Sequence, residues 1–271
     1  FGLYISPDMD TVCYTLAGIS NEKTGWGRKN ESFNVLDQIK QIGGPDWFML
    51  GDKDIAFHLE RTRLMKLDHS LTDISLELEK SIGITHNVLP MCNEKVSTIV
   101  NTEEYKEISF QEYFVKYQFL PKVNGFRFDG IKDATITEEV ERALIDADAI
   151  VLCPSNPFVS IYPILSIDGI IEILSKKYVI AVSPIIGGAA VKGPLAKIMV
   201  EFGMDVHPAS IIEMYHEFLD CFYMDDSDRN LDLGNIPSGI ILKYENILLP
   251  DIESRKNLAQ SILNTIKENN R

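Results

Sequence analysis

Two short apolar runs stand out in the second half of the chain, residues 149–153 (AIVLC) and 179–182 (VIAV). Uninterrupted runs of this length, rich in β-branched residues, are typical of strands buried on both faces of a parallel sheet. Each run is followed by a turn that contains proline, which ends a strand because it cannot donate to the sheet ladder. We therefore predict two parallel strands whose turns lie at the carboxyl edge of the sheet, where α/β proteins bind ligands.

Apolar residues spaced three or four apart predict helices over much of the remaining chain. These helices are expected at residues 7–17, 33–42, 52–66, 71–81, 137–146, 164–174, 194–202, 210–219 and 251–267. Further strands are expected at residues 86–89, 96–101, 108–117, 125–128, 222–224 and 239–243. Because strand and helix signals alternate, the predicted fold class is α/β with a mostly parallel sheet.

The turn after the second run contains Gly187 and Gly188, which allow a positive φ or the close approach of a ligand to the backbone. A compact basic segment follows, with Lys192 and Gly193 just before a predicted helix start. A strand, a glycine turn and a helix start together offer free backbone N–H groups to a phosphate. An ordinary loop between strand and helix is the plainer alternative.

Two predicted helices begin with paired carboxylates, Asp8 with Asp10 and Asp52 with Asp54. Acidic residues in a first turn complement the helix dipole, which explains them without any ligand. Carboxylates from two elements are also the ligands that a hard cation such as Mg²⁺ takes. The sequence leaves both interpretations open.

Along the helix at 52–66, Asp54, His58 and Arg61 are spaced i, i+4 and i+7 and form one polar stripe. An acid, an imidazole and a guanidinium on one stripe suit the wall of an active site. A different stripe of this helix is expected to face the core: Ile55, Leu59 and Thr62. The apolar face of the first helix is expected to be Met9, Val12, Cys13 and Leu16.

Composition limits the class of protein. The 271 residues carry a formal net charge of −14, which argues against nucleic acid as the main partner because a phosphate backbone needs a basic face. No apolar run reaches the roughly 18 residues that span a bilayer, and no signal peptide is visible, so we expect a cytoplasmic protein without a membrane partner. The four cysteines form no CxxC pair and are expected to be reduced and buried: Cys13, Cys92, Cys153 and Cys221.

The loop at residues 21–32 places Trp26 between two glycines. A tryptophan in this position either anchors the loop by packing or covers a ring-shaped ligand. Three histidines have no such polar stripe around them in the sequence, and we expect them to be structural or on the surface: His69, His207 and His216.

Several segments together resemble the 2-phospho-L-lactate transferase family of deazaflavin coenzyme F-420 biosynthesis. They follow the family's order over most of residues 5–220: SPDMDTVCYTLAGI, TGWG, WFMLGDKDIAFHLERT, LPM, FQEYFV, DADAIVLCPSNPFVSIYPIL and AVSPIIGGAAVKGPLAK. The set is specific, although each segment alone is a weak signal.

The resemblance implies a Rossmann-like, three-layer, mostly parallel α/β fold that forms a single domain over residues 1–271, with a smaller inserted subdomain at roughly 60–130. It implies transfer of a phospholactyl or phosphoenolpyruvyl group from a guanosine diphosphate-linked donor to the terminal hydroxyl of the deazaflavin Fo, with release of GMP. It also implies Mg²⁺ as the cofactor and a homodimer.

Position by position, the resemblance implies that four acids surround the metal and the acceptor hydroxyl: Asp8, Asp10, Asp52 and Asp54. Asp10 or Asp54 is expected to orient that hydroxyl or accept its proton, beside His58 and Arg61. The substrate contacts are expected at Trp26 and at the turns and basic loop that would face the nucleotide diphosphate: Ser155, Asn156, Ser183, Gly187, Gly188, Lys192 and Gly193.

The chain also departs from the family pattern. The family opens with a strand and a Gly-rich phosphate turn, and neither precedes Phe1 here. We therefore expect that the sequence represents the protein incompletely. After Pro90-Met91 the family shows acidic or small polar residues where this chain has CNEK, and residues 225–271 match only loosely.

Two other functions remain open at this point. A related group of similar fold binds nucleotide-sugars and regulates carbon metabolism or cell-wall synthesis without known catalysis. The GDxD helix and the TGWG loop favour the transferase over that group. A dinucleotide-dependent oxidoreductase is disfavoured, because the sequence has no intact GxGxxG followed by an acidic residue.

Overall fold

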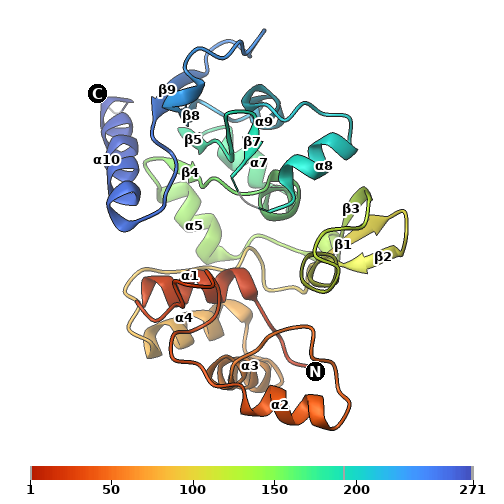
Figure 1. The fold of residues 1–271 in the computed structure, drawn as a ribbon. Coiled ribbons are helices and arrows are strands. Elements are labelled where there is room, and N and C mark those ends of the chain that lie inside the picture. Colours follow the sequence, from red (N-terminus) through yellow and green to blue (C-terminus); the bar gives the residue numbers. More distant parts are fainter. Residues whose placement is uncertain (1, 192, 270–271) are drawn as a thin grey trace. The chain divides into compact units, whose positions relative to one another are not determined.

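The computed structural model describes residues 2–191 and 193–269, which form two compact units (Figure 1). Unit 1 comprises residues 1–95 and 114–118, and unit 2 comprises residues 96–113 and 119–271. The inserted subdomain expected at roughly 60–130 includes parts of both units. It stays a prediction, because packing into units does not test for an insertion.

Unit 2 is built on a four-stranded parallel sheet with the order β4-β5-β8-β9. Its strands are β4 (Ile150–Leu152), β5 (Val179–Val182), β8 (Cys221–Asp225) and β9 (Ile241–Glu245). All four residues of β5 are buried, as the apolar run predicts, which confirms the α/β fold class. The prediction of full burial is wrong for β4, where Val151 is 37 % exposed, because among the described strands β4 pairs on one side only.

Helices cover both faces of this sheet and make three layers (Figure 1). On one face, Leu258 and Ile262 of α10 (Ile252–Asn269) pack against Ile180, Cys221 and Tyr223. Figure 1 places three helices on the opposite face: α7 (Ile170–Leu174), α8 (Leu195–Glu201) and α9 (Pro208–Tyr215). Two more helices precede them along the chain: α5 (Glu138–Asp146) and α6 (Tyr162–Leu165). The predicted three-layer arrangement is confirmed.

A second, antiparallel sheet in unit 2 has the order β2-β1-β3. Its strands are β1 (Ser97–Thr102), β2 (Lys106–Ser109) and β3 (Val123–Asp129). The strand predicted at 108–117 is wrong beyond Ser109, because the chain turns there into a π-helix at Glu112–Lys116. The cause is a capping box: Ser109 Oγ accepts from the N–H of Glu112 at 3.2 Å, and the Glu112 carboxylate accepts from the N–H of Ser109 at 3.3 Å.

Unit 1 is helical. Its helices are α1 (Pro7–Leu16), α2 (Asn34–Gln41), α3 (Asp52–Met65) and α4 (Leu71–Ser81), as predicted. The strand predicted at 86–89 is wrong, because this segment is irregular and the N–H of Val88 donates to the Glu79 side chain at 3.1 Å instead of to a strand. A small apolar core holds the unit together: Tyr14, Phe57, Leu64, Ile74 and Leu78.

The faces predicted for α1 and α3 are wrong, because both helices turn polar residues inward. The buried residues of α1 are Asp10, Cys13 and Tyr14, and those of α3 are Asp54, Phe57, His58, Arg61 and Leu64. Val12, Leu16 and Leu59 are exposed. The polar stripe of α3 is therefore part of the interior of unit 1, where its charges must find partners.

Three of the four cysteines are buried and all four are free, but Cys153 is exposed just after β4. The expectation of a buried thiol is wrong there because the strand ends one residue earlier. In the part of the chain that the structure describes, no helix is both long and apolar enough to cross a membrane.

The packing of β5 leads to a stability prediction. Ile180 is fully buried between β8 and α10, and truncation to alanine leaves a cavity in the core. We expect Ile180→Ala to lower the free energy of unfolding by about 2–4 kcal/mol in urea denaturation. Ile241→Ala, on the same sheet but 46 % exposed, is the control, with a change of about 0.5 kcal/mol or less. Equal losses would contradict this description of the core.

Candidate functional site

A buried ion pair joins α1 to α3. Arg61 donates through Nη2 to Oδ1 of Asp10 and through Nη1 to Oδ2, the latter at 3.2 Å. Both side chains are almost fully enclosed, at 4 % and 6 % exposure. Burial raises the pKa of Asp10, and the guanidinium acts in the opposite direction. This bidentate pairing uses both carboxylate oxygens of Asp10.

His58 lies beside this pair. Its Nδ1 is 3.3 Å from Nη1 of Arg61 and 3.6 Å from Oδ2 of Asp10. Burial and the Arg61 charge lower the pKa of His58 to about 4, so the ring is neutral at pH 7. A guanidinium can only donate, so Nδ1 accepts and the ring proton is on Nε2. That Nε2 is buried and has no hydrogen-bond partner.

Asp54 and Tyr14 lie next to this histidine. The Asp54 carboxyl is electrostatically coupled to His58 and Tyr14, and its Oδ1 is buried without a partner. The Tyr14 hydroxyl is also buried, and it interacts with the Asp54 carboxyl. Burial raises the pKa of both groups. Gly27 passes over the carboxylate, where a Cβ would come within 3.7 Å of Oδ2.

Asp52 has a different role from Asp54. Its exposed carboxylate accepts from the backbone N–H groups of Asn34 at 3.1 Å and Val35 at 3.0 Å and from Ser32 Oγ at 2.7 Å, and so caps the start of α2. These hydrogen bonds lower its pKa to about 2. In return, Glu31 caps α3 by accepting from the Lys53 N–H at 2.8 Å.

The four acids expected to hold Mg²⁺ do not fit one cation site. Asp10 is paired with Arg61, Asp52 caps α2, and Asp8 is exposed in the first turn of α1. Among the described residues, no group of three or more His, Cys, Asp or Glu side chains is placed to hold a metal ion. Mg²⁺ therefore stays a prediction of the family resemblance.

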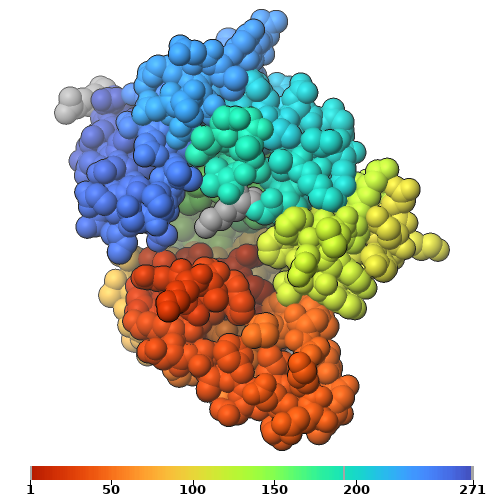
Figure 2. All heavy atoms as spheres, viewed as in Figure 1, coloured from red at the N-terminus to blue at the C-terminus, as the bar shows by residue number. Residues whose placement is uncertain are grey.

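In unit 2, the expected glycine turn belongs to a hairpin instead of a helix start. β6 (Ile185–Ile186) pairs antiparallel with β7 (Ala189–Ala190), and Gly187 and Gly188 form the turn with φ of 59° and 72°. Two positive φ values are what a two-residue hairpin turn requires. The helix α8 begins only at Leu195. The hairpin lies on the surface of unit 2 (Figure 2, green).

The backbone of this turn already donates a hydrogen bond to a carboxylate side chain of the same chain. The N–H of Gly187 donates to both carboxylate oxygens of Asp228, at 2.9 and 3.2 Å, and Asp228 is 3 % exposed. The Ser183 hydroxyl donates to the Ile185 carbonyl at 2.8 Å and stabilises the bend after β5. A phosphate at Gly187 would therefore have to displace Asp228.

The other residues expected to contact the substrate lie in separate loops. Asn156 accepts from the Phe158 N–H at 3.0 Å after β4, beside the half-buried Ser155, and its own Nδ2 is buried without a partner. Trp26 is 45 % exposed in its loop. This exposure does not distinguish a side chain that anchors the loop from one that covers a ligand. Gly193 has a φ of 68°, and Lys192 lies outside the described residues.

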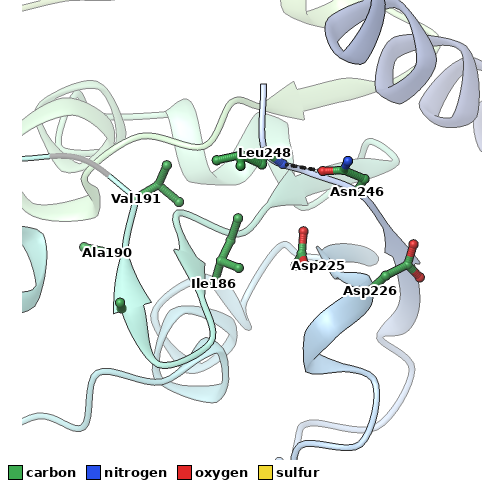
Figure 3. A pocket seen from close by; sticks show the side chains of 8 residues that line it. Ile186, Ala190, Val191, Asp225, Asp226, Asn246 and Leu248 are labelled. Atoms are coloured by element: carbon green, nitrogen blue, oxygen red, sulfur yellow. Dashed lines mark hydrogen bonds between the residues drawn. The ribbon is translucent and has the colours of Figure 1, made fainter. Parts of the chain in front are cut away.

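A hollow of about 570 Å³ opens at the carboxyl edge of the parallel sheet, beside the hairpin (Figure 3). Its lining is Ile186, Ala189, Ala190, Val191, Asp225, Asp226, Asn246 and Leu248. The place agrees with the ligand edge that the strand signals predict. The lining combines apolar side chains with two carboxylates, which disfavours a phosphate inside it.

The sequence is similar to those of known proteins. The sequence profile of the family described as 2-phospho-L-lactate transferase CofD matches residues 1–233. The chain belongs to this family. It is 36 % identical over 262 residues to the 2-phospho-L-lactate transferase of Methanosarcina mazei, covering 97 % of this chain and 86 % of that protein.

Further relatives carry the same name. The 2-phospho-L-lactate transferase of Methanococcoides burtonii is 38 % identical, covering 97 % of this chain and 85 % of the relative. That of Methanocaldococcus jannaschii is 34 % identical, covering 96 % and 84 %. A crystal structure of a Bacillus halodurans protein superimposes with a TM-score of 0.53 at 14 % identity, covering 93 % of this chain and 82 % of that one, and supports the fold alone.

Three residues next to these features were missed by the sequence analysis: Tyr14, Glu31 and Asp228. Tyr14 had a usable signal, since it lies four residues after Asp10 on α1 and so shares its face. Glu31 and Asp228 had none, because they reach Lys53 and Gly187 across 22 and 41 residues.

The Asp10–Arg61 pair predicts a large loss of stability. Asp10→Asn leaves the buried guanidinium without its charge partner, so we expect the free energy of unfolding to fall by about 3–5 kcal/mol. A double variant, Asp10→Leu with Arg61→Met, should regain part of this loss, because no buried charge is left over. Glu60→Gln breaks the exposed pair with Arg63 on the same helix and should change stability little. If the double variant lost as much free energy of unfolding as the two single variants added together, the proposed energetic coupling of Asp10 and Arg61 would be wrong.

The cap at Asp52 predicts a pH-dependent stability. The folded pKa of Asp52 is about 2, below the usual 3.9 or so of an unfolded chain. Its stabilisation is therefore full above about pH 4 and lost as the pH falls towards 2. We expect Asp52→Asn to lower the Tm at pH 6, by an amount that shrinks below pH 4. Asp37→Asn, exposed on the same helix α2, is the control, and an equal, pH-independent shift in both variants would refute the cap.

Proposed function

We propose that this chain transfers a phospholactyl or phosphoenolpyruvyl group from a guanosine diphosphate-linked donor to the terminal hydroxyl of the deazaflavin Fo, releasing GMP, in coenzyme F-420 biosynthesis. The observation that carries the proposal is membership of the family over residues 1–233, with relatives named 2-phospho-L-lactate transferase along 96–97 % of the chain. That name favours the transferase over a nucleotide-sugar-binding regulator.

The proposed step is a displacement at the β-phosphorus of the donor. The acceptor oxygen forms a new P–O bond, and the bond from the β-phosphorus to the oxygen that bridges the two phosphates breaks. GMP leaves with that oxygen and its electron pair, and the hydroxyl proton passes to a base. Such a transfer depends mainly on alignment and on neutralising charge at the phosphoryl oxygens.

In unit 1, the polar residues divide into two roles within the proposal. Asp54 has an oxygen without a partner, which suits it to receive the acceptor proton. Asp10 is held by Arg61, so this pair is suited to positioning His58 and fixing its tautomer. This division assigns the base to Asp54, where the sequence left Asp10 and Asp54 as alternatives.

In unit 2, the donor needs local positive charge or N–H donors, because the whole chain carries a net charge of −14. The candidates are the backbone of the hairpin turn and the unpartnered Asn156 Nδ2 after β4. Displacement of Asp228 from Gly187 is part of this proposal. Dependence on Mg²⁺ and assembly as a homodimer are further expectations of the same proposal.

A direct assay tests the function. The purified chain is incubated with Fo and each guanosine diphosphate-linked donor, and the product and GMP are measured by chromatography with mass detection. We expect equal amounts of product and GMP, and loss of activity with EDTA that excess Mg²⁺ restores. Fo consumption without GMP would refute the proposed bond cleavage, and activity unaffected by EDTA would refute the Mg²⁺ dependence.

The nucleotide preference is a separate prediction. GDP should raise the Tm more than ADP at equal concentration, because a ligand that binds only the folded chain stabilises it by an amount that increases with its affinity. Differential scanning fluorimetry measures both shifts, with GMP as a ligand that lacks the β-phosphate. Equal shifts from GDP and ADP would argue against a guanosine-specific donor site.

A further inference from the structure

Arg28, in the loop that follows α1, is a partly buried arginine without a carboxylate partner among the described residues. Its Nε is buried and has no hydrogen-bond acceptor. The sequence offers 40 acidic side chains, so a shortage of carboxylates does not explain an unpaired guanidinium. The arginines that do pair with a carboxylate are Arg61, Arg63, Arg127, Arg142 and Arg229. Because an unpaired buried donor is costly, Arg28 indicates an acceptor that is not part of the chain.

The backbone at Arg28 is fixed to the end of α1. Arg28 and Ser20 form an antiparallel bridge, and the N–H of Lys29 donates to the Ile19 carbonyl at 2.8 Å. The side chain therefore starts from a held position, although it lies in a loop. A side chain on a fixed backbone has less freedom to lose when a ligand binds it.

The guanidinium of Arg28 is held by an aromatic ring. Its Cζ lies 5.4 Å from the centroid of the Tyr14 ring, which itself packs edge-on against Phe57 at 5.7 Å. Contact with a ring provides no oxygen acceptor, so the N–H groups remain available. A guanidinium binds a carboxylate or a phosphate through two parallel N–H donors, which gives both affinity and direction.

Arg28 lies on the side of unit 1 where the proposed base is found. It directly follows Gly27, where a Cβ would come within 3.7 Å of Oδ2 of Asp54. The other nearby guanidinium, that of Arg61, already binds both carboxylate oxygens of Asp10. An anion beside these two carboxylates needs a further positive charge, and Arg28 supplies it.

We propose that Arg28 binds an oxyanion of the group that is transferred and holds that group beside Asp54. This inference rests on the proposed function, in which the transferred group carries both phosphoryl oxygens and a carboxylate. Either oxyanion has the chemistry that a guanidinium recognises. Arg28 would then supply part of the charge neutralisation on which phosphoryl transfer depends.

The test measures the affinity of three ligands by isothermal titration calorimetry without Fo, so that no transfer takes place. The ligands are the guanosine diphosphate-linked donor, the ethyl ester of GDP on its β-phosphate, which lacks the carboxylate, and GMP, which lacks the whole transferred group. Arg28→Gln should weaken binding of the donor by about tenfold or more, because a charge-assisted hydrogen bond is lost. It should leave the affinity for GMP unchanged.

Lys29→Gln is the matched control. Lys29 is the next residue along the chain, and its exposed ammonium donates to the Gly18 carbonyl. The substitution removes the same charge from the same loop. It should change the affinity for each of the three ligands by about twofold or less, because an exposed charge is screened by solvent.

The ethyl ester distinguishes the two oxyanions. If Arg28→Gln weakens the ester as much as the donor, Arg28 binds the phosphoryl oxygens. If it weakens the donor alone, Arg28 binds the carboxylate. Both results support the inference, whereas a folded Arg28→Gln variant that binds the donor as tightly as the wild-type chain would overturn it.

A second variant keeps the inference testable if Arg28→Gln does not fold. Arg28→Met retains an unbranched side chain on the Tyr14 ring but has no charge, and the same losses are expected. Donor binding that depends on Arg28, without conversion of Fo, would contradict the proposed function and leave the role of Arg28 standing. A wild-type chain that binds neither the donor nor the ethyl ester would overturn both.

Discussion

The buried ion pair between Asp10 and Arg61 is the contact on which unit 1 depends. Two charges in the interior are tolerated only when each satisfies the other, and the bidentate geometry does this. The pair fixes the rotation of α1 and α3 about their axes, so that polar faces point inward. Leu59 and Val12 are then left in solvent, although apolar spacing alone predicts that they are buried.

This constraint also sets the chemistry of the neighbouring side chains. Because the guanidinium only donates, His58 must accept at Nδ1 and carry its proton on Nε2. The neutral ring then offers a donor beside the Asp54 carboxylate, in surroundings from which water is largely excluded. The ion pair between Asp10 and Arg61 thus orients His58 and leaves its Nε2 without a partner inside the protein.

Unit 2 follows a different principle. Its parallel sheet places the turns after β5, β8 and β9 at one edge, and the hollow beside the hairpin lies there. The glycine turn is held by Asp228 and is not open to solvent anions. The backbone N–H of Gly187 thus already has a carboxylate of the same chain as its acceptor. An anion at this N–H group would have to replace the carboxylate of Asp228.

The sequence by itself determined the family and most of the helices and strands, with the segments at 86–89 and 110–117 as exceptions. The apolar run of β5 and the helical spacing over residues 52–66, 71–81 and 137–146 are local signals, and each predicts its element correctly because it acts within a few residues. The tertiary structure alone decided which faces are buried and which acids are free. Asp52 and Asp54 look alike in sequence, but one caps α2 and the other faces Tyr14. Their partners come from segments 17 or more residues away, and no local pattern records such pairing.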